Sequence, residues 1–202
     1  RNIYRLLDDL VVQQTTKRSS YLDWEEYFMA TAFLAAKRSK DPVTQVGACI
    51  VNEDKHIVGI GYNGMPRGCS DDDFEWGRGE NNRLESKYLY AYHAETNAIL
   101  NKNSANVKNC TLYVMLFPCS ECAKLIIQSG ITKVVHVSDK DNGHAFYEAS
   151  EKMLLAAGVT IEKYTRERQN VVIDFTKIDR IQHEESAGTS KRTSETADVE
   201  TK

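Results

Sequence analysis

The chain has 202 residues, 41% hydrophobic and 27% charged, which is the balance of an ordinary globular protein. Its 26 Lys and Arg against 29 Asp and Glu give a net charge of −3, which excludes a nucleic-acid binder that relies on bulk positive charge. Five cysteines are too few for a disulfide-stapled secreted scaffold, so we expect reduced thiols and a cytoplasmic protein. No apolar run approaches the roughly 20 residues of a membrane span, so we expect no membrane partner.

Composition divides the chain into three zones. Residues 1–20 hold a short apolar cluster at roughly helical spacing and then a polar stretch, which predicts a helical or linker segment. Residues 183–202 are mostly Ser, Thr, Glu and Lys, and they cannot bury enough surface to offset their ordering entropy. We therefore predict a disordered tail at 183–202 and a functional domain over residues 21–182.

Helical and strand patterns alternate within this domain. Apolar residues recur at helical spacing from Trp24 to Ala35, and Asp23 with Glu26 can form a capping box. Two apolar runs, 46–51 and 57–62, flank a polar turn and predict a β-hairpin. The later elements are predicted as a helix at 93–103, a strand at 110–116, a helix at 119–129, a strand at 133–138, a helix at 145–157 and a strand at 160–164. A hairpin followed by βαβ units predicts an α/β fold with a mixed five-stranded sheet between two helical layers.

The sharpest local feature is the segment Pro118-Cys119-Ser120-Glu121-Cys122. Two cysteines three positions apart can both turn towards one tetrahedral metal ion. Pro118 suits a helix start, where the positive end of the helix dipole favours the ionised thiolates that bind metals. Taken alone, the pair could equally be two small residues packed in a core.

Further upstream, His93-Ala94-Glu95 begins a predicted helix. One histidine and two cysteines make three ligands and leave the fourth position of a tetrahedral zinc ion open for water, which marks a catalytic site. Glu95 is not needed as a ligand and is placed to shuttle a proton for that water, first as base and then as acid. H-x-E followed by P-C-x-x-C is the signature of the zinc-dependent cytidine deaminases. The sequence therefore predicts zinc held by His93, Cys119 and Cys122, with Glu95 as the catalytic residue.

Most of the domain resembles the deoxycytidylate (dCMP) deaminases of the eukaryotic type. The matching stretches lie in order and at compatible spacing at residues 24–29, 38–42, 45–51, 59–66, 93–95, 117–119 and 122–124. The resemblance implies a cytidine-deaminase-like fold and hydrolysis of dCMP to dUMP and ammonia, which supplies thymidylate synthesis. It also implies a homo-oligomer, usually a hexamer, that is activated by dCTP and inhibited by dTTP.

The resemblance extends to residues of the substrate pocket. It implies that Asn63 hydrogen-bonds the sugar or base, although Asn63-Gly64 could also be a plain turn. It implies that small side chains and backbone amides line the ring pocket at Val46, Gly47, Ala48 and Ala94. The 5′-phosphate needs a donor, and the candidates by their position after the fourth strand are Ser138 and Lys140.

The effector site is also implied by the resemblance. It lies where glycines let backbone amides approach phosphates, at Gly61, Tyr62, Asn63 and Gly64. Arg67 could be a further phosphate partner or an ordinary solvated arginine. Residues 64–92, here called the insertion, are long for a structureless loop, and such loops are usually functional or disordered; effector control is the function expected here. The acidic run 71–73 within it could help hold Mg²⁺ beside a triphosphate or could simply be solvated.

Other functions remain open at this point. The substrate could be free cytidine or dCTP. It could also be cytosine in single-stranded nucleic acid, but the net charge and the acidic insertion disfavour that reading, and we expect no nucleic-acid partner. A zinc-stabilised scaffold without activity is the alternative outside the enzymes, and Glu95 disfavours it because a structural site has no use for a proton shuttle.

Overall fold

The computed structural model of the protein describes residues 17, 19–139, 145–165 and 170–176. Residues 170–176 belong to a separate unit that starts at Arg168, and they form neither helix nor strand. The predicted tail at 183–202, most of the segment 1–20, and Lys140 lie outside the described residues. The domain boundaries at 20, 182 and 183 therefore stay predictions.

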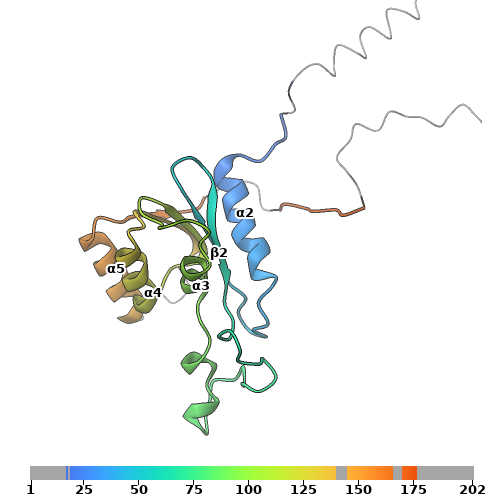
Figure 1. Cartoon of the computed structure of the whole chain (residues 1–202), viewed down its shortest axis with the longest axis vertical. Coiled ribbons are helices and arrows are strands. Elements are labelled where there is room, and N and C mark those ends of the chain that lie inside the picture. The colour runs from blue at the N-terminus through green and yellow to red at the C-terminus, as the bar shows by residue number, and fades with distance from the viewer. Residues whose placement is uncertain (1–16, 18, 140–144, 166–169, 177–202) are drawn as a thin grey trace, which may run out of the picture. The chain divides into compact units, whose positions relative to one another are not determined.

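The helices and strands of the described chain occur in the predicted order (Figure 1). They are α2 (Trp24–Ala36), β1 (Gly47–Val51), β2 (Ile57–Tyr62), α3 (Ala94–Leu100), β3 (Thr111–Leu116), α4 (Ser120–Ser129), β4 (Lys133–Ser138), α5 (Ala145–Ala156) and β5 (Thr160–Lys163). Two short 3-10 helices, η1 (Arg83–Glu85) and η2 (Lys87–Leu89), lie within the insertion.

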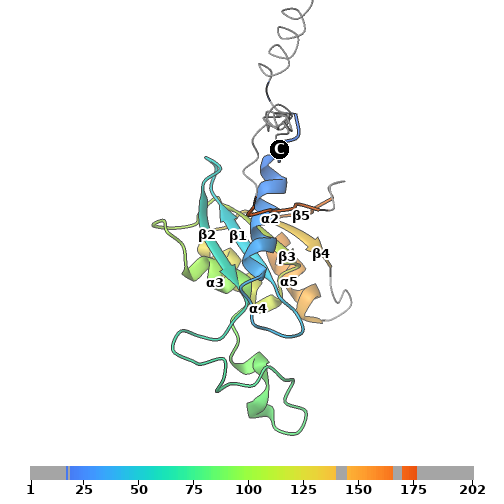
Figure 2. The same ribbon diagram turned by 90° about the vertical axis from the view of Figure 1, so that its right-hand side faces the viewer.

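The predicted mixed five-stranded sheet is confirmed, with the strand order β2-β1-β3-β4-β5. β1 pairs antiparallel with β2 and β3, whereas β3, β4 and β5 are parallel. Parallel neighbours need a crossover connection, and α4 and α5 supply the two crossovers. α2 covers one face of the sheet, while α3, α4 and α5 cover the other (Figure 2).

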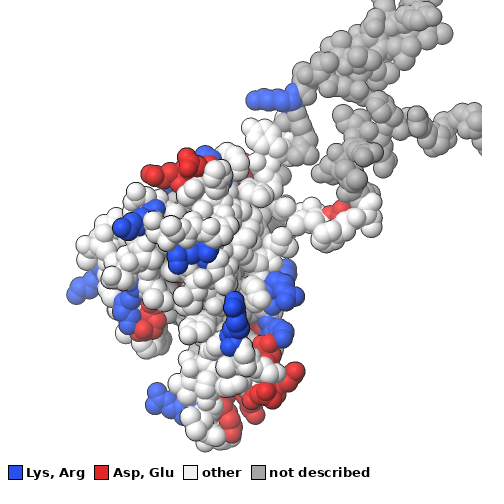
Figure 3. Space-filling view, in the orientation of Figure 1, with Lys and Arg blue, Asp and Glu red and all other residues white. Residues whose placement is uncertain are grey.

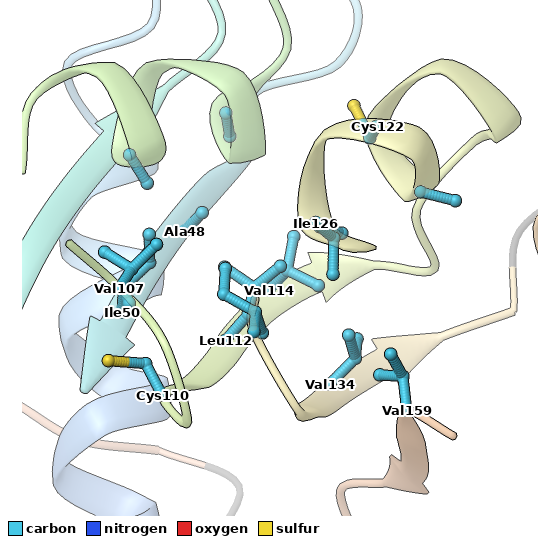
Figure 4. Close-up of a cluster of buried hydrophobic side chains, with 14 of the residues drawn as sticks. Ala48, Ile50, Val107, Cys110, Leu112, Val114, Cys122, Ile126, Val134 and Val159 are labelled. Carbon is cyan, nitrogen blue, oxygen red and sulfur yellow. The ribbon is translucent and has the colours of Figure 1, made fainter. Parts of the chain in front are cut away.

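The larger core lies between the sheet and the helices α3, α4 and α5 (Figure 4). Its fully buried side chains include Ile50, Leu112, Val114, Ile126 and Leu154. This packing holds α3 and α4 on one face of the sheet. The first turns of these two helices carry the signature residues, so the core determines where those residues meet.

α2 begins with the predicted capping box, in which Asp23 accepts from the Glu26 backbone N–H and Glu26 accepts from the Asp23 backbone N–H. The helical spacing identifies the buried stripe only in part: Phe28, Ala32 and Ala35 are buried, whereas Trp24 and Tyr27 are 53% and 45% exposed. The buried residues of α2 are Phe28, Met29, Ala32, Ala35 and Ala36. This stripe is selected by β1, where a Cβ on Gly47 would lie 1.8 Å from the Ala32 carbonyl oxygen.

α3 is shorter than the sequence predicts, because it ends at Leu100 and not near residue 103. The Asn101 N–H closes the last turn on the Asn97 carbonyl. Two residues later the Asn103 N–H donates to the Val58 carbonyl, 2.9 Å away. The chain thus leaves the helix to bond with β2, a long-range contact that local periodicity does not contain.

The insertion is an arm that projects from the sheet (Figures 1 and 2). Reciprocal backbone hydrogen bonds between Gly64 and Tyr92 close its neck, with N···O distances of 3.1 and 2.9 Å. Inside the arm, Phe74 packs edge-on against Tyr90 at a centroid distance of 4.9 Å. The Tyr90 hydroxyl donates to the Leu84 carbonyl. The insertion therefore has internal structure of its own.

Candidate functional site

Three predicted metal ligands meet where the first turns of α3 and α4 converge. His93 is the N-cap of α3, Cys119 is the N-cap of α4, and Cys122 lies in the first turn of α4. His93 Nδ1 lies 3.4 Å from the Sγ atom of each cysteine. All three ligand atoms lie within 4.8 Å of one another. The sheet and the core thus bring together residues that are 26 and 29 positions apart.

These distances fit a zinc ion. Tetrahedral bonds of about 2.3 Å to sulfur and about 2.0 Å to nitrogen place the two ligand atoms about 3.5 Å apart. The observed separation of 3.4 Å agrees for both cysteines. Nδ1 is the nitrogen that faces the sulfur atoms, so it is the ring atom available for the metal. The residues present therefore suit zinc, with three protein ligands and one open position.

One of the three ligands is already in its metal-binding form, and the other two hold protons that a metal must displace. A hydrogen bond from Cys122 lowers the pKa of Cys119 to about 3. The hydrogen bond with that Cys119 sulfur raises the pKa of His93 to about 9. The pKa of Cys122 is raised, because its thiol donates to Cys119 and is buried. One thiol is thus ionised in advance, and metal binding displaces the remaining protons.

Glu95, the predicted catalytic residue, is the second residue of α3 and is only 5% exposed. Burial raises its pKa because a charged carboxylate loses hydration there, while the nearby His93 lowers it. A carboxyl group in this environment can both accept and hold a proton. Its place two residues after His93 puts it beside the ligands without making it one of them.

The predicted ring-pocket residues divide between the two faces of the sheet. Val46 and Ala48 pack in the same core as Ala94 and Cys122. Gly47 lies between them on the opposite face, where α2 approaches it closely. Side chains alternate along a strand, so Gly47 could contribute to this pocket only through its backbone. The role of these residues in substrate binding stays a prediction.

Asn63 lies just before the neck of the insertion, where an antiparallel bridge pairs Gly64 with Tyr92, the residue before His93. The side chain of Asn63 is 8% exposed and is not that of a plain turn residue. Its Oδ1 accepts from the Val46 N–H at 2.9 Å, and its Nδ2 donates to the Thr44 carbonyl at 3.0 Å.

Of the two candidates for binding the 5′-phosphate, only Ser138 lies within the described residues. Ser138 ends β4 and pairs with Leu116 at the end of β3. Its carbonyl accepts from the Phe117 N–H at 2.9 Å, which places it close to the turn that leads to Cys119. Lys140 lies outside the described residues. The assignment of both to the 5′-phosphate stays a prediction.

The predicted effector residues have other contacts in this structure. A Cβ on Gly61 would lie 2.2 Å from Ala98 N and 2.3 Å from Ala94 O, so this glycine is needed for α3 to pack on β2. The Tyr62 carbonyl accepts from Asn97 Nδ2 at 2.8 Å. Arg67 is exposed. The effector site, with Gly64 and the proposed Mg²⁺ at 71–73, therefore stays a prediction.

Sequence reasoning missed two residues, Asp41 and Lys87. Lys87 Nζ lies 2.6 Å from Asp41 Oδ2, and the side chains are only 8% and 4% exposed, respectively. A turn signal was present at Asp41, because its Oδ1 accepts from the backbone N–H groups of Val43 and Thr44. Nothing local marked Lys87, whose partner is 46 positions away.

A mixed sheet on which two helix starts bring one histidine, two cysteines and a buried glutamate together defines a zinc-dependent deaminase. Residues 22–138 match the family model described as the cytidine and deoxycytidylate deaminase zinc-binding region. This match covers more than half of the chain and includes the histidine and both cysteines. The chain therefore belongs to the cytidine and deoxycytidylate deaminase family.

Relatives and solved structures agree with this assignment. The deoxycytidylate deaminase of Mus musculus is 59% identical over 162 residues, covering 80% of this chain and 91% of the mouse protein. The deoxycytidylate deaminase of Homo sapiens is 57% identical over the same length and coverage. The crystal structure of the dCMP deaminase from cyanophage S-TIM5 in complex with dCMP and dUMP is 27% identical, with a TM-score of 0.55. That match covers 71% of this chain and 100% of the phage chain.

Proposed function

We propose that this protein hydrolyses dCMP to dUMP and ammonia and so supplies dUMP for thymidylate synthesis. The observation that carries the proposal is the identity of 57–59% over 91% of the length of mammalian proteins named deoxycytidylate deaminase. The phage enzyme with the same fold holds dCMP and dUMP. The cluster of His93, Cys119, Cys122 and Glu95 supplies the chemistry that such a reaction needs.

The three metal ligands and Glu95 have separate roles in this reaction. His93, Cys119 and Cys122 would hold zinc, which when bound makes water acidic enough to serve as a nucleophile near neutral pH. Glu95 accepts a proton from the attacking water and passes it to the ring nitrogen beside the amino-bearing carbon. Glu95 then takes the second proton of that water and gives it to the departing amine, which leaves as ammonia. One water is consumed, the C–N bond breaks and a C–O bond forms.

Charge on the surface favours a small nucleotide over a polynucleotide. On the face shown in Figure 3, Lys and Arg side chains stand in small separate groups, and acidic side chains gather on the insertion. A protein that tracks a nucleic-acid backbone uses a continuous positive groove. A mononucleotide needs only a few placed donors.

We further infer a homo-oligomer, in the form of a hexamer, that dCTP activates and dTTP inhibits. Large apolar side chains on α2 and on the insertion support an assembly because they are 42–69% exposed. They include Phe33, Leu34, Leu84 and Tyr88. The five cysteines are unpaired, which supports a reducing compartment such as the cytoplasm. In the described part of the chain, none of the helices is long and apolar enough to cross a membrane.

The test is ammonia release by zinc-replete protein from dCMP and cytidine, each measured with and without added dCTP as effector, and from dCTP alone. We expect turnover of dCMP to exceed that of the other two substrates by at least tenfold. The Glu95→Gln variant is the negative control. Turnover of cytidine without turnover of dCMP would refute the substrate assignment, and zinc-loaded protein without ammonia release would favour the scaffold.

A further inference from the structure

We propose that Lys87, which is carried by the insertion, is a positioning residue for the substrate pocket. Through Asp41 it fixes the orientation of the Asn63 side-chain amide. The inference rests on the proposed function, because it concerns how dCMP is held. It gives the insertion a direct mechanical link to the pocket.

The first step is the buried ion pair. Lys87 Nζ donates to Asp41 Oδ2 at 2.6 Å, and neither side chain is more than 8% exposed. A buried carboxylate stays ionised only when a cation and hydrogen bonds compensate for lost hydration. Lys87 supplies the cation, so Asp41 remains a carboxylate that can accept hydrogen bonds but cannot donate them.

The second step is the way in which Asp41 uses its two oxygens. Oδ1 accepts from the backbone N–H groups of Val43 and Thr44, at 2.9 and 3.1 Å. Oδ2 accepts from Lys87 and also from Asn63 Nδ2, at 3.3 Å. The carboxylate thus joins the turn before β1, the insertion and the pocket asparagine in one buried network.

The third step is the orientation of the Asn63 amide. Its nitrogen faces two acceptors, Asp41 Oδ2 and the Thr44 carbonyl, while its oxygen faces the donor Val46 N–H. A flipped amide would set oxygen against two acceptors and nitrogen against a donor. Both Nδ2 protons are therefore used, and Oδ1 keeps one lone pair for a donor on the substrate. The donors that dCMP offers are its amino group and its sugar hydroxyl.

The fourth step is the rigidity of Lys87 itself. Its backbone N–H donates to the Gly77 carbonyl at 3.0 Å. Its carbonyl accepts from the Tyr90 and Ala91 N–H groups, at 3.1 and 2.8 Å. The internal structure of the insertion therefore sets where the Nζ atom lies. A change in the structure of the insertion moves the Lys87 Nζ atom that pairs with Asp41. Through Asp41 it then alters the orientation of the Asn63 side-chain amide.

A second ion pair joins the same two segments and provides a matched control. Lys40, next to Asp41, pairs with Asp71 of the insertion. The Lys40 side chain is 64% exposed, and the described contacts of this pair do not include Asn63. If the ion pairs acted only by attaching the insertion to the rest of the domain, removing either pair would have the same effect on KM for dCMP.

The experiment compares Lys87→Met with wild-type protein. Met keeps an unbranched side chain one atom shorter and removes the charge, so buried Asp41 takes up a proton and becomes a possible donor towards Asn63. We expect KM for dCMP to rise at least tenfold and kcat to change less than threefold. In the Glu95→Gln background, the Kd of dCMP should rise by the same factor. The control Lys40→Met, which removes the exposed ion pair with Asp71, should keep KM within twofold.

The folding of each variant is checked by its zinc content and its Tm. If Lys87→Met does not fold, the double variant Asp41→Asn/Lys87→Met replaces it. The double variant buries no charge at this pair. The amide that it introduces at position 41 still places an N–H donor opposite Asn63 Nδ2. The same rise in KM is expected. A folded, zinc-loaded variant lacking Lys87 with KM within twofold of wild type would overturn the inference, as would an equal rise in the Lys40→Met control. Wild-type protein without dCMP turnover would instead refute the proposed function, and the inference with it.

Discussion

Replacing Gly61 by alanine tests whether this glycine serves packing or effector binding. The added Cβ would lie 2.2 Å from Ala98 N and 2.3 Å from Ala94 O, whereas ordinary contact begins at 3.4 Å. Both obstructing atoms belong to the backbone of α3, so no side chain can rotate away. α3 must therefore retreat from β2 by about 1 Å, because the interior offers no free space.

The expected cost follows from that displacement. Overpacking of this kind costs about 1–3 kcal/mol, and rigid backbone on both sides places Gly61→Ala at the upper end. For a chain of this size such a loss lowers Tm by about 6–12 °C. α3 also carries His93 and Glu95, and a metal site tolerates ligand shifts of only about 0.5 Å. Zinc affinity should therefore fall together with stability.

The assay is thermal unfolding together with zinc content after dialysis. Gly64→Ala is the matched control, because the nearest atom to its added Cβ is a Tyr62 ring carbon at 3.8 Å. It should match wild type in both measurements. A Gly61→Ala protein with wild-type Tm and zinc content would refute the packing argument. Loss of the dCTP response in that same protein would make Gly61 an effector residue instead.

Three further predictions concern the site and the sheet. Glu95→Gln should keep its zinc and lose about 10²–10⁴-fold in turnover. The control Glu121→Gln, at an exposed glutamate, should keep the turnover of wild type. A Glu95→Gln protein with the turnover of wild type would show that Glu95 is not the proton shuttle. Chelation of zinc should lower the free energy of unfolding, by about 2.7 kcal/mol when zinc had been present at a hundredfold excess over its Kd, and Cys122→Ser should be insensitive to the chelator. Burial lowers the pKa of His136 from its ordinary 6.5 more than Asp139 raises it, so the stability linked to neutral His136 is complete above pH 6.5 and is lost as the pH falls below it. Unfolding free energies across pH 5–8 should therefore fall more steeply at the acid end in wild type than in His136→Gln, and parallel curves would contradict this.

The order of the elements could be predicted from the sequence because its signals are local. The capping box at Asp23 and Glu26 and the left-handed turn at Gly130, with φ of 82°, are written in a few neighbouring residues. Element ends were less predictable. α3 stops at Leu100 because Asn103 bonds to β2, and α2 buries Met29 while Trp24 stays exposed because β1 selects the stripe.

The sequence by itself determined the chemistry of this protein, because zinc ligation and proton transfer depend on residue types at short spacing: His93 with Glu95, and Cys119 with Cys122. Only the tertiary structure decided how these residues are positioned relative to one another and to the rest of the chain. It set the ligand atoms 3.4 Å apart, packed Gly47 against the backbone of α2, and joined Asp41 to Lys87 across 46 positions. Such contacts depend on how helices and strands pack, and packing brings together residues whose separation along the chain carries no pattern.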